Sequence, residues 1–318
     1  MENKNKRLII IDSNSVIHRA YHALPPLTTK KGELVNAVYG FLLVFFKALK
    51  DFQPDFVAAT FDFPGPTLRH KKYEKYKAKR PPAPKELYQQ IPKVKEVLNA
   101  FGVSLFEKEG YEADDIIGAI AKQAPKKQIL PKIETIILSG DQDSLQLVNE
   151  NTKVFALRKG IKDIILYDEN SVKEKFQGLE PKELLDYKAL RGDPSDNIPG
   201  VTGVGEKTAT ELLLTFGSLE GIYSEIEKKS KKSDKIRPKL KELLVKYKDQ
   251  AFLSKDLAKI NEDMPLDFNL EKCRWGEYDK EKAAQALKNL EFHSLISRLP
   301  AVKEEDKKES IGGNLKLW

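Results

Sequence analysis

Short apolar runs in the first half of the chain alternate with longer stretches in which apolar residues recur every three or four positions. The runs are rich in β-branched residues, three of them end in aspartate, and they predict buried strands over 7–12, 56–62, 103–106, 135–141 and 153–157. The periodic stretches predict helices over 35–50, 84–101 and 113–122. Strands that alternate with helices indicate an α/β fold with a mostly parallel central sheet flanked by helices.

The second half of the chain has a different pattern. Strand signals fade from about residue 181, and the sequence then predicts helices joined by loops at RGDPSDNIPGVTGVG (191–205) and NEDMPLDF (261–268). We therefore expect an α/β part over 1–180 and a helical region over 181–300. Residues 301–318 are charged and lack apolar periodicity, which predicts a disordered tail.

Composition narrows the class of protein. The 318 residues include 55 Lys and Arg against 48 Asp and Glu, a formal charge of +7 that suits a polyanionic partner or, equally, a solvated lysine-rich surface. The single cysteine, Cys273, excludes a disulfide framework and a cysteine-based zinc cluster. This cysteine usage fits a reducing setting, so we expect a cytoplasmic protein. No apolar run approaches the roughly 20 residues of a membrane span, so we expect no membrane partner.

Acidic residues collect where the predicted strands end. The carboxyl ends of parallel strands share one edge of a sheet, so side chains from separate segments can converge there. A lone aspartate at such a position is more often a helix cap or a turn residue, but here the pattern repeats. Clustered carboxylates repel one another unless a cation neutralises them, and their oxygens suit Mg²⁺ or Mn²⁺. Two neighbouring ions of this kind can hydrolyse a phosphodiester. The candidate ligands are Asp12, Asp62, Glu112, Asp114, Asp115, Asp141, Asp143, Asp193 and Asp196.

A basic and aromatic segment, TLRHKKYEKYKAKRPPAP (67–84), follows one of these acids. In a helix, Arg69, Tyr73, Lys77 and Arg80 would share one face. The cations could bind phosphates, and Tyr73 and Tyr76 could stack on bases. The alternative is a solvated basic helix, but a carboxylate pocket alone would repel a nucleic acid, so nearby cations favour contact.

A glycine-rich turn, GVTGVGEKTATELL (200–213), is a near miss for a nucleotide-binding loop because Glu206 separates Gly205 from Lys207. We interpret it as a tight helix–turn–helix, the backbone N–H groups of which hold a DNA phosphate at the next helix. Lys207 and Thr208 would add side-chain contacts. The alternative is an ordinary turn between packed helices.

Together these motifs resemble the 5′-nuclease domain of bacterial DNA polymerase I, within the flap endonuclease superfamily. The resemblance covers about residues 7–300 and implies an α/β nuclease core with a helical arch at about 67–101 and a helix–three-turn–helix element at about 198–215. The matching segments are IIIDSNSVIHRAYHALPPLTTKKGELVNAVYGF, FDFPGPTLRHKKYEKYKAKR, GYEADDIIGAIA, LSGDQDSLQLV, YKALRGDPSDNIPGVTGVGEKTA and FLSKDLAKI.

The resemblance also implies roles for single residues. One metal would be held by Asp12, Asp62, Glu112 and Asp114. A second would be held by Asp114, Asp141, Asp143 and Asp193, with Asp115 and Asp196 close by or acting through water. Arg69, Lys77 and Arg80 match the arch residues that bind the scissile phosphate, and Arg19 matches a basic position near the first metal. The turn with Gly200, Gly203 and Gly205 matches the hairpin that holds duplex backbone and often binds K⁺.

Two departures from the family pattern are visible. Ser13 stands where the family usually has glycine after the first aspartate, and we expect little effect unless that position needs a positive φ. The chain ends at Trp318, so it is either a free-standing nuclease or an excised polymerase domain. Its last residues, GGNLKLW, resemble a sliding-clamp docking peptide through Leu315, Leu317 and Trp318, although a random apolar tail is the alternative.

The expected function is a Mg²⁺-dependent, structure-specific 5′-3′ exonuclease and flap endonuclease. Its substrates would be branched or nicked duplex DNA with a 5′ end or flap, and RNA primers, during replication and repair near the nucleoid, with a polymerase as a possible partner. The alternatives are a non-catalytic branched-DNA-binding module, which the complete set of acids disfavours, and a metal-dependent ribonuclease, which the glycine hairpin disfavours.

Overall fold

The protein was analysed as a computed structural model that describes residues 5–127 and 132–300. The predicted disordered tail, with Leu315, Leu317 and Trp318, lies outside the described residues. A six-stranded sheet forms the centre, in the order β3-β2-β1-β4-β5-β6. Strands β1 to β5 are parallel and β6 is antiparallel to β5. The strands are β1 (Lys6–Asp12), β2 (Phe56–Thr60), β3 (Ser104–Phe106), β4 (Ile133–Ser139), β5 (Thr152–Lys159) and β6 (Asp163–Tyr167).

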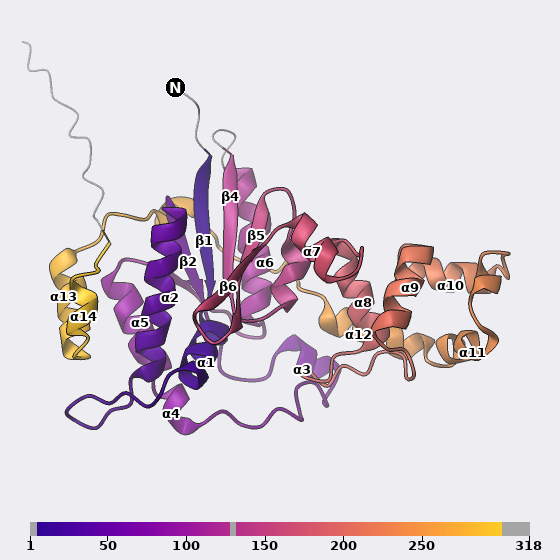
Figure 1. The fold of residues 1–318 in the computed structure, drawn as a ribbon, viewed down its shortest axis with the longest axis horizontal. Coiled ribbons are helices and arrows are strands. Elements are labelled where there is room, and N and C mark those ends of the chain that lie inside the picture. The colour runs from indigo at the N-terminus through magenta and orange to yellow at the C-terminus, as the bar shows by residue number, and fades with distance from the viewer. Residues whose placement is uncertain (1–4, 128–131, 301–318) are drawn as a thin grey trace, which may run out of the picture.

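Helices cover both faces of the sheet because the strands are apolar on both sides. Ile9 and Ile11 of β1 pack in one cluster, and Leu8 and Ile10 pack in the other. The first face carries α1 (Ser13–Ala23), α2 (Asn36–Phe52), α5 (Ile91–Ala100), α13 (Lys280–Asn289) and α14 (His293–Ile296). The second face carries α6 (Ala113–Gln123) and α7 (Glu169–Lys175) (Figure 1).

A helical region extends from the β6 side of the sheet (Figure 1). It consists of α8 (Leu184–Arg191), α9 (Glu206–Phe216), α10 (Leu219–Glu227), α11 (Pro238–Lys246) and α12 (Lys248–Ala258). The chain then returns to the sheet, where Trp275 N donates to Asp55 O at 2.8 Å and α13 packs beside α5. Residues 270–300, which the sequence groups with the helical region, therefore lie against the α/β core.

The mostly parallel sheet expected from the sequence is confirmed, as are the five predicted strands. Strand β6 was missed because it is an exposed edge strand without a buried apolar run. The single helix expected over 84–101 is wrong, because the chain forms two helices, α4 (Lys85–Tyr88) and α5. The break precedes Pro92, which has no N–H to bond back to the carbonyl of Tyr88 and is tolerated in the first turn of α5. No helix in the two described ranges is long and apolar enough to cross a bilayer.

Candidate active site

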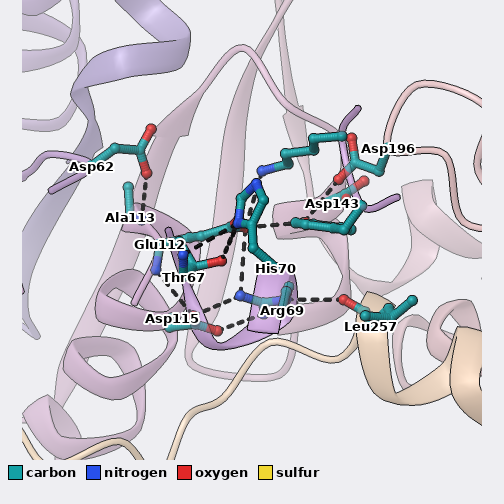
Figure 2. Close-up of polar contacts among 12 residues, drawn as sticks. Asp62, Thr67, Arg69, His70, Glu112, Ala113, Asp115, Asp143, Asp196 and Leu257 are labelled. Atoms are coloured by element: carbon teal, nitrogen blue, oxygen red, sulfur yellow. Dashed lines mark hydrogen bonds and ion pairs between the residues drawn. The ribbon is translucent and has the colours of Figure 1, made fainter. Parts of the chain in front are cut away.

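Two acids lie at the carboxyl edge of the sheet, one as the last residue of a strand and one just after a strand. Asp12 ends β1, caps α1 through Ser15 N at 3.2 Å and accepts from the Ser139 hydroxyl at 2.6 Å. Asp62 follows β2 and accepts from Ala113 N at 2.9 Å (Figure 2). The hydrogen bonds fix both carboxylates at the same edge, as the strand endings predicted.

The start of α6 supplies three more acids. Glu112 is the N-cap, and Asp115 completes a capping box by accepting from Glu112 N at 3.2 Å. Asp114 lies between them in the sequence and lines one cavity together with Asp12 and Asp141. Negative side chains are favourable at a helix N-terminus because the unpaired N–H groups there carry partial positive charge.

The remaining acids come from two turns. Asp141 and Asp143 follow β4, and Asp143 N donates to Asp141 Oδ1 at 3.0 Å. Asp193 and Asp196 lie in a turn closed by two backbone hydrogen bonds of 2.8 Å between Asp193 and Ile198.

The acids surround two adjoining cavities. The first, of about 490 Å³, is lined by Asp12, Asp62, Glu112, Asp114, Asp141 and Asp196. The second, of about 630 Å³, is lined by Asp141, Asp143 and Asp193. Asp141 and Arg80 border both, so the two cavities form one acidic site. Eight of the nine predicted acids meet here, and Asp115 lines neither cavity.

Two cations of the 67–84 segment border the first cavity. Lys77 Nζ lies 3.0 Å from Glu112 Oε2, and the Arg80 guanidinium binds Asp196. The hydroxyl of Tyr76 lies 3.1 Å from carboxylate oxygens of both Glu112 and Asp196, within hydrogen-bond distance of each. The segment is therefore attached to the acids by the side chains of Tyr76, Lys77 and Arg80.

The expected helical face over 69–80 is wrong. Helix α3 (Leu68–Lys72) ends at Lys72, and the chain continues in turns with a positive φ of 55° at Lys77. Lys77 N donates to Asp196 O at 2.8 Å, a bond that draws the backbone onto the neighbouring turn. Tyr73 is half-buried, and the Tyr76 ring is 3 % exposed, so in this arrangement it is not available to stack on a base.

Arg69 lines neither cavity, although its guanidinium lies 3.4 Å from Glu112 Oε2. Its guanidinium binds both carboxylate oxygens of Asp115, at 2.8 and 2.7 Å, and donates to the carbonyls of Leu257 and Lys259 at 2.9 and 2.7 Å (Figure 2). The side chain is 12 % exposed. Burial opposes the charge, but Asp115 raises the pKa of Arg69 above its ordinary value.

Lys188 is a site residue that the sequence analysis missed. Its ammonium lies between two predicted metal ligands, bound to Asp143 and 2.7 Å from Asp193 Oδ2. Burial would lower the pKa of Lys188, but the two carboxylates raise it. The sequence did contain a signal for this contact. Lys188 comes five residues before Asp193, and it lies on the last turn of α8, next to the loop that carries Asp193.

The pKa values of the acids are shifted by burial and by the neighbouring charges. Burial, with repulsion from Asp141 and Asp62, raises the pKa of Asp12 to about 6. Burial and Asp141 raise the pKa of Asp143 to about 7. Burial and repulsion from Asp12 raise the pKa of Asp114 well above its ordinary value. Although burial would raise the pKa of Asp193, Lys188 lowers it to about 2. Of the two acids that share Lys188, Asp143 therefore binds a proton more readily than Asp193.

This all-oxygen donor set fits a hard divalent cation. Within the described residues, however, no three acids are close enough to enclose an ion as they stand. Glu112, Asp143, Asp193 and Asp196 instead bind lysine or arginine side chains, which offset their charge.

Comparisons with known proteins fit this geometry. A family model described as 5′-3′ exonuclease, N-terminal resolvase-like domain matches residues 7–177, and one described as 5′-3′ exonuclease, C-terminal SAM fold matches residues 179–281. The chain belongs to the 5′-3′ exonuclease family. This confirms the resemblance found in the motifs and the prediction that the chain is a nuclease, a phosphodiester hydrolase.

Relatives in the 5′-3′ exonuclease family include proteins of two lengths. DNA polymerase I of Bacillus subtilis is 43 % identical over 296 residues, which are 93 % of this chain and 32 % of the relative. The chain thus spans about a third of the length of the polymerases that it matches. A 5′-3′ exonuclease of Aquifex aeolicus is 38 % identical over 306 residues, 96 % of this chain and 99 % of the relative.

Two solved structures share the fold of this family member. A bacteriophage T5 flap endonuclease in a pseudo-enzyme–product complex with DNA and metal ions has a TM-score of 0.66 at 16 % identity, covering 92 % of this chain and 96 % of that chain. The catalytic core of Rad2 in complex with DNA substrate has a TM-score of 0.55 at 18 % identity, covering 93 % of both chains.

The glycine hairpin (192–205) of this exonuclease connects α8 to α9. Gly200 has a φ of 62° and is packed so closely that an added Cβ would lie 2.2 Å from Gly192 N. Gly200 N donates to Ser254 Oγ at 3.0 Å and its carbonyl accepts from Gln250 at 2.7 Å. The buried end of the hairpin is thus fixed to α12, whereas Gly203, Gly205 and Lys207 are exposed and Thr208 is half-buried.

Two further predicted positions lie next to the acids, and one of them, Arg19, lines both cavities. Arg19 donates to Gly140 O at 3.0 and 3.3 Å, beside Asp141, and an added Cβ at Gly140 would meet the Arg19 side chain at 2.6 Å. Ser13 begins α1 and is absent from the described residues with a positive φ, so the conformation that would require glycine does not occur there.

Proposed function

We propose that this chain is a Mg²⁺- or Mn²⁺-dependent, structure-specific 5′-3′ exonuclease and 5′-flap endonuclease that hydrolyses DNA phosphodiesters. The observation that carries the proposal is the meeting of eight carboxylates from separate segments at one sheet edge, next to Lys77 and Arg80 and connected by a short turn to the glycine hairpin.

The acids of the first cavity, Asp12, Asp62, Glu112 and Asp114, would hold one divalent ion. Asp114, Asp141, Asp143 and Asp193 would hold the second, with Asp196 close by. Bound ions of this kind activate water and neutralise the charge that develops on the phosphate. Asp115, both oxygens of which are engaged by Arg69, is assigned to positioning rather than to ligation.

Lys77 and Arg80 would bind the scissile phosphate. Both border the first cavity, and both now bind acids that are candidate metal ligands. Cations at these acids would free the two side chains to donate to phosphate oxygens. Arg69 would hold the start of the segment in place through Asp115 instead of touching the substrate.

The glycine hairpin would bind the duplex backbone at its exposed N–H groups. Asp193 and Asp196 precede it in the same loop, and Gly200 fixes that loop to α12. This connection would set the distance between the held duplex and the cut phosphate. K⁺ binding at the hairpin stays a prediction. The carbonyl of Gly200 accepts a hydrogen bond from Gln250, and the carbonyl of Gly205 accepts one from Ala209.

Several finer points follow from the same proposal. RNA primers annealed to DNA would be substrates because the proposed contacts are to phosphates, which RNA and DNA share. A role near the nucleoid, a polymerase partner and clamp docking through the C-terminal residues are further proposals.

The substrate preference can be tested with end-labelled DNA. Purified protein and Mg²⁺ are incubated with a 5′-flap, a matched 3′-flap and a blunt duplex. Cleavage of the 5′-flap is expected, and the variants Asp141→Ala and Asp143→Ala are expected to abolish it. Asp267→Ala, at an exposed acid outside both cavities, is the matched control. Equal cleavage of both flaps, or active Asp141→Ala and Asp143→Ala proteins, would refute the proposal.

A further inference from the structure

The positive charge of this chain is concentrated in one lysine-rich segment, residues 228–248. The segment holds ten of the 55 basic residues and two of the 48 acidic residues. The other 297 residues therefore carry 45 basic side chains against 46 acidic ones, so the rest of the protein is close to neutral.

Most of these cations are exposed and without acidic partners. Among the described residues, the ion pair formed by this segment is Lys248 with Glu227. Lys241 donates to Ser233, and Lys232 lies over the Phe216 ring. Like charges placed together repel one another and do not stabilise a fold. The exposed cations are Lys228, Lys229, Lys231, Lys232, Lys235, Arg237, Lys239 and Lys246.

The segment is attached to the glycine hairpin. It runs from the end of α10 through α11, at the end of the molecule opposite α13 and α14 (Figure 1). A Cβ added at Gly203 would lie 3.1 Å from the Leu243 side chain of α11, so this helix packs against the exposed part of the hairpin. Val201 and Val204 of the hairpin share a core cluster with Leu244.

We propose that residues 228–248 form a second backbone-binding surface, which binds the duplex arm of the substrate beyond the glycine hairpin. The inference rests on the proposed function, because it assumes that the hairpin holds duplex DNA. Helix α11 has nine residues and spans about 13 Å, the length of about four base pairs. The surface would therefore lengthen the contact with the duplex.

The chemistry favours a duplex over a single strand. Surfaces for single strands combine cations with aromatic rings on which bases stack. Here Tyr223 is 3 % exposed and its hydroxyl donates to Leu244 O at 3.0 Å. Tyr247 is half-buried beneath Lys246. Exposed lysines without free rings suit phosphates, which a duplex presents along both strands.

The experiment compares two charge-matched variants. The test variant carries Lys231→Gln, Lys235→Gln, Arg237→Gln and Lys239→Gln. The control carries Lys272→Gln, Lys280→Gln, Lys282→Gln and Lys288→Gln, four exposed lysines far along the chain with the same change in net charge. Because the replaced side chains are exposed, both variants are expected to have the stability of the parent. Thermal unfolding followed by circular dichroism checks this.

Fluorescence anisotropy without divalent ions then measures binding to 5′-flap DNA with a long or a short duplex arm. On the long arm, the test variant is expected to bind about tenfold more weakly, and the slope of log K against log salt is expected to fall by about 2 to 4. On the short arm, parent and test variant are expected to bind equally. Equal binding on the long arm, an equal loss in the control variant, or an equal loss on the short arm would overturn the inference.

Cleavage distinguishes this inference from the proposed function. At saturating short-arm substrate, the test variant is expected to cut at the parent rate, since the segment lies outside both acidic cavities. If the parent binds through the segment and never cuts, the nuclease proposal fails while the duplex-binding surface stands. If the parent cuts and the four substitutions leave long-arm binding unaffected, the duplex-binding surface fails while the nuclease proposal stands.

Discussion

Arg69 binds Asp115 through two parallel hydrogen bonds of 2.8 and 2.7 Å, and through the same guanidinium it joins three separate parts of the molecule. It lies in α3, its partner lies in the first turn of α6, and the carbonyls of Leu257 and Lys259 lie at the end of α12. The start of the cation-bearing segment, the acids of α6 and the helical region are thus connected at one buried point.

Replacement of Arg69 is expected to be costly to stability. Arg69→Met leaves the Asp115 carboxylate buried without its cation and is expected to lower the free energy of unfolding by about 3–5 kcal/mol. Arg69→Lys keeps the charge but loses the paired geometry, so an intermediate loss is expected. Urea unfolding measures both, and the double variant with Asp115→Asn is expected to regain part of the loss. Parent-like stability of Arg69→Met would contradict the connecting role.

Lys188 is expected to compete with a divalent ion for Asp143 and Asp193. Lys188→Met removes that competitor, so calorimetric titration is expected to show about tenfold tighter Mn²⁺ binding in the absence of DNA, a change of about 1.4 kcal/mol. Lys255→Met is the matched control, because Lys255 lies between Asp186 and Glu220 at 2.6 and 2.7 Å, outside both cavities. Weaker Mn²⁺ binding by Lys188→Met would show that Lys188 organises the acids instead.

Stability is expected to depend on pH through Asp12 and Asp143. Their pKa values rise from 3.8 to about 6 and about 7, so the stability that they contribute is present below about pH 4 and is lost as the pH rises through 6 and 7. Metal binding requires both groups to be deprotonated. The increase in Tm caused by Mg²⁺ is therefore expected to grow between pH 5 and pH 8. A constant increase, or one as steep in the Asp12→Asn/Asp143→Asn protein, would contradict this assignment.

The glycine hairpin offers a paired test of backbone packing. Gly200→Ala would place a Cβ 2.2 Å from Gly192 N at a φ of 62°, so a loss of about 2–3 kcal/mol in unfolding free energy and weaker duplex binding are expected. Gly205→Ser meets no heavy atom within 4 Å and provides a good N-cap for α9, so unchanged stability is expected. Similar stabilities of the two proteins would refute the tight packing at Gly200.

The sequence predicted the sheet and the acids because both depend on local pattern. A β-branched run that ends in aspartate indicates a buried strand and places the carboxylate at its end, as at Asp12. The route of residues 73–80 could not be predicted from helical spacing, because it depends on bonds from Tyr76 and Lys77 to the distant Asp196.

The sequence also could not predict which side chains far apart in the chain bind each other. Arg69 carries the same charge as Lys77, and only the fold distinguishes the one that binds Asp115 from the one that borders the cavity. The concentration of charge in the lysine-rich segment could be counted from the sequence, but the net charge of +7 for the whole chain does not show where that charge lies.

The central claim is that the carboxylates of the sheet edge hold the divalent ions that make the chain a 5′ nuclease. Asp114 tests it most directly, since it lines the first cavity with Asp12 and Asp141 and is assigned to both ions. The measurement is the single-turnover rate of 5′-flap cleavage against Mg²⁺ concentration, for the parent and Asp114→Asn. We expect a parent rate that rises with Mg²⁺ and is abolished by EDTA. For Asp114→Asn we expect a rate about a thousandfold lower, about 4 kcal/mol of barrier, with flap binding intact. Cleavage that resists EDTA, or a parent-like rate in Asp114→Asn, would contradict the claim.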